Sequence, residues 1–238
     1  MLKNKIEEKK GLIINDNPKS AFSEAIKSIR TNLNFASIEK DIKVILVTSA
    51  EAGDGKSFIS ANLAGAYSQE NKNVLIIDAD LRRGRQHQIF NINNFTNMGY
   101  SNLILNYKEN TRIGRYIINT ENNNINLLPT GPTPPNPIEL LASDKNKRLL
   151  NKLKERFDII IIDCPPVIGL SDTLIMTQYS DANIVVVSNK KTKVELLNRV
   201  KKNFEQVNAK ISGVVINKVP VKGNNYYSSY TSQYYSEE

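Results

Sequence analysis

Three short groups of residues in the sequence could bind and transfer phosphate. The first ends the segment 44–57, VILVTSAEAGDGKS, where an aliphatic run leads into a loop closed by Gly55-Lys56-Ser57. Glycines in such a loop let successive N–H groups point at an anion, the lysine reaches the β- and γ-phosphates, and the serine hydroxyl lies on Mg²⁺. The usual pattern begins with glycine, whereas this loop has Ala50. The segment is therefore an imperfect phosphate-binding loop that needs support from other residues.

The other two groups are carboxylates that directly follow aliphatic runs. Asp78 and Asp80 follow residues 74–77, and Asp163 follows residues 159–162. Mg²⁺ prefers hard oxygen ligands and keeps several waters, so one or two of these carboxylates would suffice for a Mg-nucleotide. Three indicate an additional task, such as a general base for an incoming hydroxyl. Alternatively, Asp78 could cap a helix and Asp80 could face solvent.

The segments that must position these groups alternate between short aliphatic strands and helices. Strands are expected at residues 44–47, 74–77, 124–128, 159–162, 184–187 and 214–216. Helices are expected at residues 20–38, 57–69, 99–107, 111–118, 138–142, 144–157 and 192–207. This alternation predicts an α/β, phosphate-loop NTPase-like three-layer fold: a parallel sheet with helices on both faces. All three groups would then lie at the carboxyl ends of strands, where such sheets bind ligands.

Length and composition exclude several classes of protein. The chain has 238 residues and is 40% hydrophobic, which suits one large domain with a sizeable core. No apolar run is long enough to span a membrane and the first ten residues have no hydrophobic signal region, so we expect a cytoplasmic protein. A single cysteine, Cys164, and a single histidine, His87, argue against a disulfide framework and a Cys/His metal site.

The net charge of +8 could indicate an anionic partner. The basic residues are scattered, apart from Arg82-Arg83-Gly84-Arg85, and no aromatic residues are interleaved with them as in RNA-binding proteins. We therefore interpret the charge as belonging to solvated faces, and we expect no nucleic-acid partner.

The two ends of the chain differ from the middle. Residues 1–19 are charged and predict a weakly ordered lead-in, residues 20–220 a single domain, and residues 221–238 a flexible tail without aliphatic periodicity. The tail contains five of the ten tyrosines: Tyr226, Tyr227, Tyr230, Tyr234 and Tyr235. Such a tail cannot bury them in a core, and one interpretation is an adhesive structural segment with no chemistry.

The order of these motifs, together with residues 131–141 (GPTPPNPIELL) and the tyrosine-rich tail, resembles the bacterial protein-tyrosine kinases of capsule and exopolysaccharide assembly. The resemblance covers nearly the whole chain from residue 20. It implies an ATP- and Mg²⁺-dependent protein-tyrosine kinase that phosphorylates its own tail tyrosines in trans within a ring of subunits. It also implies a role in regulating polysaccharide synthesis and export.

The resemblance also implies a role for individual residues. The nucleotide would be bound by Gly53, Asp54, Gly55, Lys56, Ser57, Phe58 and, through adenine, Asn217. The catalytic residues would be Asp78 as the base for the tyrosine hydroxyl, with Lys56 and Asp80. The metal would be held by Ser57, Asp80 and Asp163. For Asn217, a role at a strand edge or in a turn remains open.

The family has an E-x-x-R-x-x-R oligomerisation motif on its N-terminal helix, which here reads Glu24-x-x-Lys27-x-x-Arg30. Lysine keeps the charge of arginine but loses its planar bidentate fork, so ring assembly could be weaker. These residues could also form a solvated face. The chain resembles the kinase half of split systems, which implies activation by the cytoplasmic tail of a transmembrane protein, recruitment to the inner face of the cell membrane, and further protein tyrosine substrates.

Two other functions fit parts of the sequence. Partition and septum-site ATPases share the fold and the D-x-P-P run, but their loop carries a lysine that crosses a dimer to the partner's phosphates, and the equivalent residue here is Glu51. A basic binding module that uses ATP as a switch would bind with strong salt dependence. Two residues near the motifs stay open: Arg82 could contact phosphate or the incoming tail, and Asp172 could cap a helix or lie near the γ-phosphate.

Overall fold

The core of the protein is a seven-stranded sheet made of aliphatic strands. A computed structural model describes residues 12–36, 41–92, 98–122 and 124–220. The strands are β1 (Val44–Ser49), β2 (Val74–Asp78), β3 (Ile118–Asn119), β4 (Ile125–Leu128), β5 (Ile159–Asp163), β6 (Ala182–Ser188) and β7 (Gly213–Asn217). Their order is β3-β4-β2-β5-β1-β6-β7, and every pair is parallel except β3–β4. The predicted parallel sheet is confirmed.

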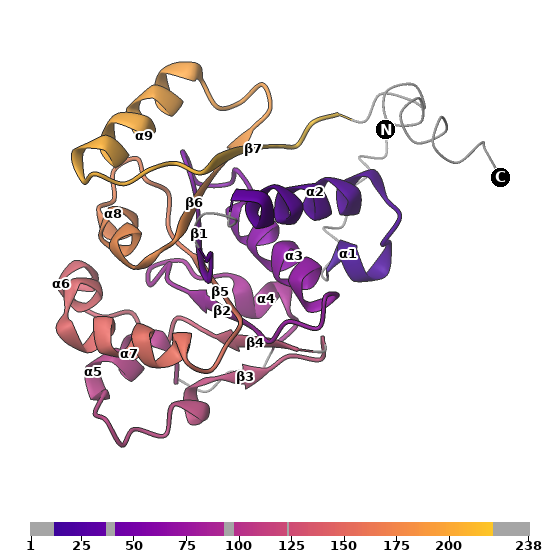
Figure 1. Cartoon of the computed structure of the whole chain (residues 1–238). Helices are drawn as coiled ribbons and strands as arrows, with labels where there is room; N and C mark the ends of the chain where they lie inside the picture. The colour runs from indigo at the N-terminus through magenta and orange to yellow at the C-terminus, as the bar shows by residue number, and fades with distance from the viewer. Residues whose placement is uncertain (1–11, 37–40, 93–97, 123, 221–238) are drawn as a thin grey trace, which may run out of the picture.

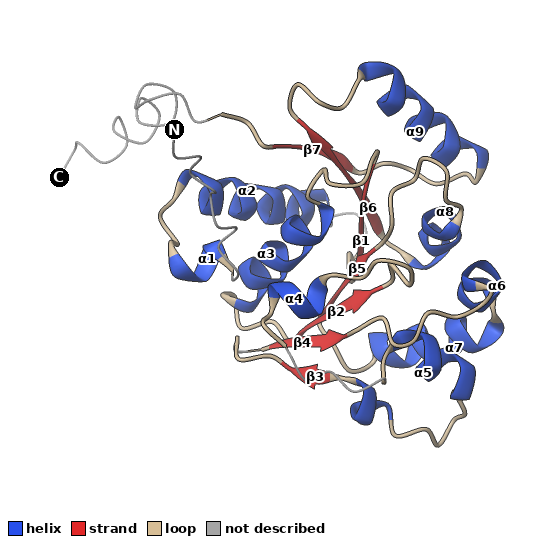
Figure 2. Cartoon of the chain, turned by 180° about the vertical axis from the view of Figure 1, so that it is seen from behind, coloured by secondary structure: helices blue, strands red, loops and turns tan. Residues whose placement is uncertain are grey.

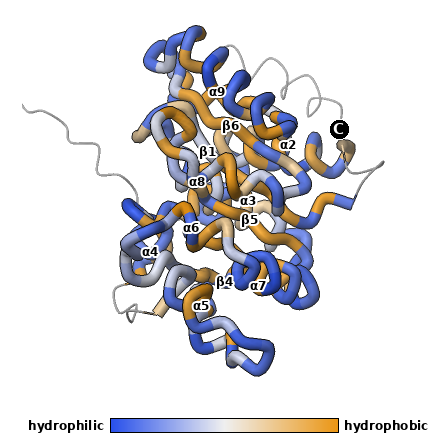
Figure 3. The backbone as a smooth tube through the Cα atoms, turned by 90° about the vertical axis from the view of Figure 1, so that its left-hand side faces the viewer, coloured by the Kyte–Doolittle hydropathy of each residue, from blue (hydrophilic) through white to orange (hydrophobic). Residues whose placement is uncertain are grey.

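Helices cover both faces of this sheet (Figures 1 and 2). They are α1 (Ile13–Asp16), α2 (Ala21–Ala36), α3 (Lys56–Ser68), α4 (Gln86–Ile89), α5 (Tyr100–Asn106), α6 (Pro137–Ala142), α7 (Asp144–Lys154), α8 (Asp172–Met176) and α9 (Val194–Gln206), with 3₁₀ turns η1 (Ile113–Tyr116) and η2 (Thr177–Tyr179). Helices α1–α4 pack on one face and α5–α9 on the other. Both sides of the central strands are therefore buried, which explains why their sequences are continuous aliphatic runs. Figure 3 shows such hydrophobic segments in orange in the middle of the molecule.

The start of the domain differs from the prediction. Residues 12–16 were expected to belong to a weakly ordered lead-in, yet Leu12 and Ile14 are buried in the core between α2 and α3. The Ile14 backbone N–H donates to Asn62 Oδ1 at 3.1 Å. Gly65 leaves space for the Ile14 side chain, because a Cβ at residue 65 would lie 2.6 Å from Ile14 Cγ2. The prediction was wrong for these residues because one turn of helix is too short to show a period.

Smaller differences occur at the edge of the sheet. Residues 111–118 were predicted as a helix, but only the turn η1 forms, and the chain then enters β3 antiparallel to β4. The short helix α4 was not predicted, and α8 was expected only as the helix that Asp172 could cap. Residues 1–11 and the tail, 221–238, with all five of its tyrosines, lie outside the described residues.

The register of the sheet brings the predicted carboxylates together. Asp78 at the end of β2 lies directly beside Asp163 at the end of β5. Asp163 is in turn beside Val47 of β1, which leads into the phosphate loop. Parallel strands end at the same edge of a sheet, so three segments far apart in the sequence deliver their polar residues to one place.

Candidate active site

The phosphate loop connects the end of β1 to the start of α3. Gly53 and Gly55 have φ angles of 86° and 101°, a left-handed backbone that favours glycine. The Asp54 carboxylate is buried and accepts the backbone N–H of Glu51 at 2.9 Å, which closes the loop on itself. Backbone N–H groups in such a turn, followed by a helix N-terminus, form a binding site for an anion.

Lys56 lies at the centre of the oxygen atoms that the sequence predicted. Its ammonium is 3.2 Å from Asp80 Oδ2, 3.4 Å from Asp163 Oδ1 and 3.2 Å from Ser57 Oγ. Burial alone would lower the pKa of Lys56, but the charges of Asp163, Asp80 and Asp78 outweigh burial and raise it above its usual value. Lys56 therefore stays protonated throughout the physiological range and is available to neutralise phosphate.

The Asp78 carboxylate is buried, and only one of its two oxygens has a hydrogen-bond partner among the described residues. Its side chain is fully buried; Oδ2 accepts the backbone N–H of Gln86 at 3.0 Å, and Oδ1 has no hydrogen-bond partner among the described residues. Burial and the charge of Asp163 raise the pKa of Asp78 to about 8, although the Gln86 N–H and Lys56 act in the opposite direction. Asp78 thus contacts the start of α4, as the capping alternative expected, and it still offers one oxygen.

Asp80 does not face solvent, so that alternative is wrong. Its side chain is 8% exposed, and Oδ1 accepts the backbone N–H of Arg83 at 3.0 Å while Oδ2 pairs with Lys56. Asp172, at the start of α8, is fully buried and pairs with the half-exposed Arg82 at 3.4 Å. Arg82, which lines the cleft next to Asp80, is therefore paired with a carboxylate 90 residues further along the chain.

Gln86 is a site residue that the sequence did not reveal. It is buried, and its side-chain amide donates to Asp163 Oδ2 at 2.8 Å and to the Ser57 carbonyl at 3.0 Å. Its backbone N–H also binds Asp78, so one residue holds two of the three acidic positions. In the sequence, Gln86 stands in the polar run RGRQHQ, which gives no signal of burial.

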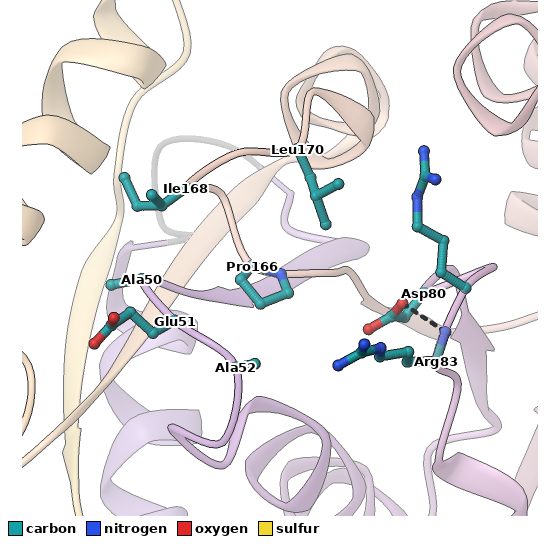
Figure 4. Close-up of a pocket in the computed structure, with 9 residues that line it drawn as sticks. Ala50, Glu51, Ala52, Asp80, Arg83, Pro166, Ile168 and Leu170 are labelled. Atoms are coloured by element: carbon teal, nitrogen blue, oxygen red, sulfur yellow. Dashed lines mark hydrogen bonds between the residues drawn. The ribbon is translucent and has the colours of Figure 1, made fainter.

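An open cleft of about 410 Å³ lies against Asp80 (Figure 4). Its lining consists of Ala50, Glu51, Ala52, Asp80, Arg82, Arg83, Pro166, Ile168 and Leu170. Figure 4 shows Pro166 and Leu170 across the cleft from the Arg83 guanidinium, with Glu51 at the other end. An apolar wall facing cationic groups suits an aromatic side chain that approaches an anionic centre.

The remaining predicted residues lie at different distances from this centre. Asn217 touches the phosphate loop, with Nδ2 donating to the Asp54 carbonyl at 2.8 Å. Phe58 packs against Phe22 of α2, their rings 5.2 Å apart, so its side chain is partly engaged by the protein itself.

The three residues predicted for oligomerisation lie on α2, and each has a partner within the chain. Glu24 and Lys27 pair with each other at 2.8 Å. Arg30 donates to the Ala66 carbonyl of α3 at 2.6 Å and pairs with Glu70 at 2.9 Å. Arg30 therefore joins α2 to the end of α3.

The residues present fit a hard divalent cation. Oxygen atoms of Ser57, Asp80 and Asp163 converge on one cationic group, the Lys56 ammonium. Among the described residues, no three His, Cys, Asp or Glu side chains cluster tightly enough to hold a metal alone. Mg²⁺ takes few protein ligands and is completed by water and phosphate oxygens, so one hydroxyl and two carboxylates are a suitable set.

The sequence and structure were compared with known proteins. The family described as AAA domain matches residues 42–216. A protein of Staphylococcus aureus with the name "Putative tyrosine-protein kinase CapB" is 38% identical over 92% of this chain and 94% of its own length. The tyrosine-protein kinase YwqD of Bacillus subtilis is 33% identical over 90% of this chain and 88% of YwqD. The tyrosine-protein kinase Wzc of Salmonella typhimurium is 31% identical over 93% of this chain, which spans only 30% of Wzc.

Solved structures agree. The chimerical protein CapA2B2 superposes with a TM-score of 0.81 at 37% identity, covering 88% of this chain and 90% of that one. The kinase domain of Escherichia coli Etk gives a TM-score of 0.82 at 29% identity, covering 90% and 85%. The septum site-determining protein MinD of Pyrococcus horikoshii gives a TM-score of 0.59 at 21% identity and shares the fold alone.

These comparisons decide between the alternatives left open by the sequence. The similarity to kinases is higher in identity and in superposition than that to the septum-site protein, and it covers more of the chain. Within the described ranges, no helix is long and apolar enough to cross a bilayer. The chain belongs to the family of bacterial tyrosine-protein kinases that includes CapB, YwqD, Wzc and Etk.

Proposed function

We propose that this chain transfers the γ-phosphoryl group of Mg-ATP to tyrosine hydroxyls. The observation that carries the proposal is the contact of Lys56 with Asp80 and Asp163, within 3.4 Å, beside the buried carboxylate of Asp78, one oxygen of which has no hydrogen-bond partner among the described residues. A nucleotide switch needs the first three residues only. A basic carboxylate next to them is useful when a hydroxyl has to be deprotonated.

The transfer step assigns one task to each residue. Asp78 takes the proton of the phenolic hydroxyl, the phenolic oxygen forms a bond to the γ-phosphorus, and the bond to the β,γ-bridging oxygen breaks with its electron pair leaving on ADP. Lys56 and the amides of residues 53–57 neutralise the phosphate charge, which is the main requirement of phosphoryl transfer. Asp78 is suited to the proton transfer because its raised pKa makes the ionised carboxylate a stronger base than an ordinary one, and so closer to the phenol with its pKa of about 10.

The metal would be held by Ser57, Asp80 and Asp163, with Gln86 fixing the orientation of the Asp163 carboxylate. When bound, Mg²⁺ supplies charge that favours the departure of ADP. Asp80 would thus pair with Lys56 before the metal binds and would contact the metal afterwards. Asn217 and Phe58 would border the nucleotide.

The proposed acceptors are the five tail tyrosines and tyrosines of other proteins. Transfer in trans between subunits of a ring, assembled through Glu24, Lys27 and Arg30, would bring each tail to a neighbour's cleft. A flexible tail raises the local concentration of its tyrosines at that site. The apolar wall of Pro166 and Leu170 in the cleft supports an aromatic acceptor.

A membrane partner is part of the proposal. This chain spans only 30% of Wzc, so Wzc contains a large additional part. The chimerical protein CapA2B2 joins parts of more than one protein in a single chain. We infer that a separate transmembrane activator supplies a cytoplasmic tail that recruits the kinase to the inner face of the membrane, and that the pair regulates capsule or exopolysaccharide synthesis and export.

Two variants together test whether phosphate is transferred and whether it passes from one chain to the tail of another. Lys56→Met keeps the tail but lacks the phosphate-binding ammonium, and a chain truncated after Val221 keeps the active site but lacks the tyrosines. Incubated with Mg-ATP, neither should acquire tail phosphotyrosine alone, whereas mixing them should label the Lys56→Met chain. Lys202→Met, which removes an exposed lysine of α9, should label itself as the wild type does. Phosphotyrosine on purified Lys56→Met protein alone would sink the proposal.

A further inference from the structure

The outer side of the phosphate loop is held by three side chains from the far end of the sequence. Lys191 Nζ donates to the Ala52 carbonyl at 3.3 Å. Lys218 Nζ donates to the Gly53 carbonyl at 2.7 Å, and Asn217 Nδ2 donates to the Asp54 carbonyl at 2.8 Å. Three consecutive carbonyls therefore each have a donor, supplied by the last residue of β7 and by the segments that follow β6 and β7.

These contacts have a direct consequence for the N–H groups of the loop. In a planar trans peptide the C=O and the next N–H point in opposite directions. Fixing the carbonyls of residues 52–54 on the outside therefore fixes the N–H groups of residues 53–55 on the opposite side. Those are the groups with which a phosphate loop binds an anion. The donors on the outside thus set the direction of the amides that face the ligand.

A left-handed backbone occurs at Lys218 itself and at the residue before Lys191. Lys218 has φ 59°, and Lys190, immediately before Lys191, has φ 58°. Residues other than glycine, asparagine and aspartate rarely adopt this left-handed backbone conformation. Where they do, surrounding contacts usually maintain it. Glycine at either place would relieve the strain. At Lys218 the strained turn lets the side chain return over the loop.

The loop is also shaped to receive these donors. A Cβ on Gly55 would lie 2.1 Å from Asn217 Nδ2, so the absence of a side chain there admits the amide. A Cβ on Gly53 would lie 3.7 Å from Lys191 Nζ. Thr192, next to Lys191, donates to Asp54 Oδ1 at 3.3 Å and adds a fourth contact to the same side.

We propose that Lys218, Asn217 and Lys191 are positioning residues that preorganise the phosphate loop by holding its outer carbonyls. The proposal rests on the nucleotide site described above, but it concerns contacts of these side chains with the loop carbonyls and not with the nucleotide. The partition ATPases have a lysine at the position of Glu51, and it binds phosphates of a partner subunit. In this chain the two lysines at the loop, Lys191 and Lys218, come from the chain itself and bind backbone carbonyls.

The test uses the full-length chain, the variants Lys218→Met and Lys218→Gly, and Lys202→Met as the control. Amide hydrogen exchange of the peptide covering residues 50–58 is measured without nucleotide, and the Kd for Mg-ADP is measured by calorimetry. Both Lys218 variants should exchange this peptide faster than wild type and bind Mg-ADP about 3- to 10-fold more weakly, the loss expected for one hydrogen bond. Lys202→Met should match wild type in both.

Lys218→Gly separates positioning from general stability. Because glycine relieves the strained φ, its melting temperature should not fall although its affinity does. Weaker binding with unchanged exchange would mean that Lys218 acts through its charge alone and would overturn the inference, as would wild-type affinity in Lys218→Met. If the wild-type protein itself fails to bind Mg-ADP, the proposed function fails first, and the exchange data still decide whether the loop is held.

Discussion

Asp78 shows how a single residue can be suited to transfer at a cost in stability. Its carboxylate is buried beside Asp163, and one oxygen lacks a partner among the described residues. A buried carboxylate without full compensation is unfavourable in its charged form, which is why its pKa is raised to about 8. The same environment that destabilises the folded protein makes Asp78 a stronger base.

This leads to a pH dependence of stability in the protein without nucleotide. The pKa of Asp78 is 3.8 when unperturbed and about 8 in the folded protein, so between these values the folded state holds a proton that the unfolded state has lost. The free energy of unfolding should therefore fall as pH rises across this window, with a slope of up to ~1.4 kcal/mol per pH unit. Asp78→Asn should lack this decline.

Denaturant unfolding at several pH values measures the effect. Asp78→Asn should be more stable than wild type near pH 8, with the difference shrinking toward pH 4. Glu121→Gln, which removes an exposed carboxylate, should follow the wild-type curve. A difference between Asp78→Asn and wild type that is the same at all pH values would contradict the assignment of the raised pKa to Asp78.

Replacing the Gln86 side chain should lower activity, although this side chain takes no part in the proposed transfer step itself. Gln86→Met removes the donor to Asp163 Oδ2 and Ser57 O, so the metal-binding carboxylate loses its fixed orientation. The rate of phosphotyrosine formation at fixed Mg-ATP should fall about 10- to 100-fold, the usual effect of losing a group that orients a metal ligand. Raising the Mg²⁺ concentration should recover part of the loss.

Gln88→Met is the matched control, since Gln88 lies on the same short helix and is exposed. It should keep wild-type activity. If Gln86→Met lost activity and thermal stability in proportion, with no response to Mg²⁺, its role would be structural.

At the scale of elements, α1 is an anchor for the face of the sheet that carries α2 and α3. Ile14 fills the space left by Gly65, and its backbone is fixed by Asn62. Arg30 ties α2 to the end of α3 through Ala66 and Glu70. Since α3 begins with Lys56 and Ser57, these contacts hold the helix on which the site depends.

Truncating Ile14 should therefore destabilise the whole domain. Ile14→Ala removes a fully buried side chain and should lower the free energy of unfolding by about 2–4 kcal/mol. Val194→Ala, at a side chain that is 70% exposed, should change it by less than about 0.5 kcal/mol. Chemical denaturation measures both. Equal effects of the two substitutions would show that α1 is not part of the core.

For the molecule as a whole, charge connects phosphorylation with assembly. The chain has a formal net charge of +8, and each phosphotyrosine adds about −1.5 to −2. Five of them would add roughly −8 to −10, enough to cancel the charge of the chain. Chains that carry such tails would repel one another's acidic sites.

We therefore expect full tail phosphorylation to dissociate the proposed ring. Protein incubated with Mg-ATP is separated by size, and each fraction is analysed by mass spectrometry. Phosphate-rich chains should be found in the smaller species and phosphate-poor chains in the larger. The chain truncated after Val221 should keep one size with or without Mg-ATP. Heavily phosphorylated chains in an undiminished assembly would refute the connection.

The sequence alone determined the parts of this protein that depend on local signals. Aliphatic runs predicted the central strands, and Gly55-Lys56-Ser57 predicted the phosphate loop. Because parallel strands end at one edge, the same reading predicted that Asp78, Asp80 and Asp163 would meet. These predictions succeeded because each needed only a residue's neighbours in the chain and the general geometry of a parallel sheet.

The tertiary structure decided what depends on contacts between distant segments. Gln86 binds Asp163, 77 residues away, and Lys218 binds the Gly53 carbonyl, 165 residues away. The burial of Ile14 depends on Gly65 of another helix, and the partners of Arg30 lie beyond its own helix. Gln86, Lys218 and Arg30 are of residue types compatible with an exposed position, and for all four residues only the packing of segments remote in sequence supplied the partner.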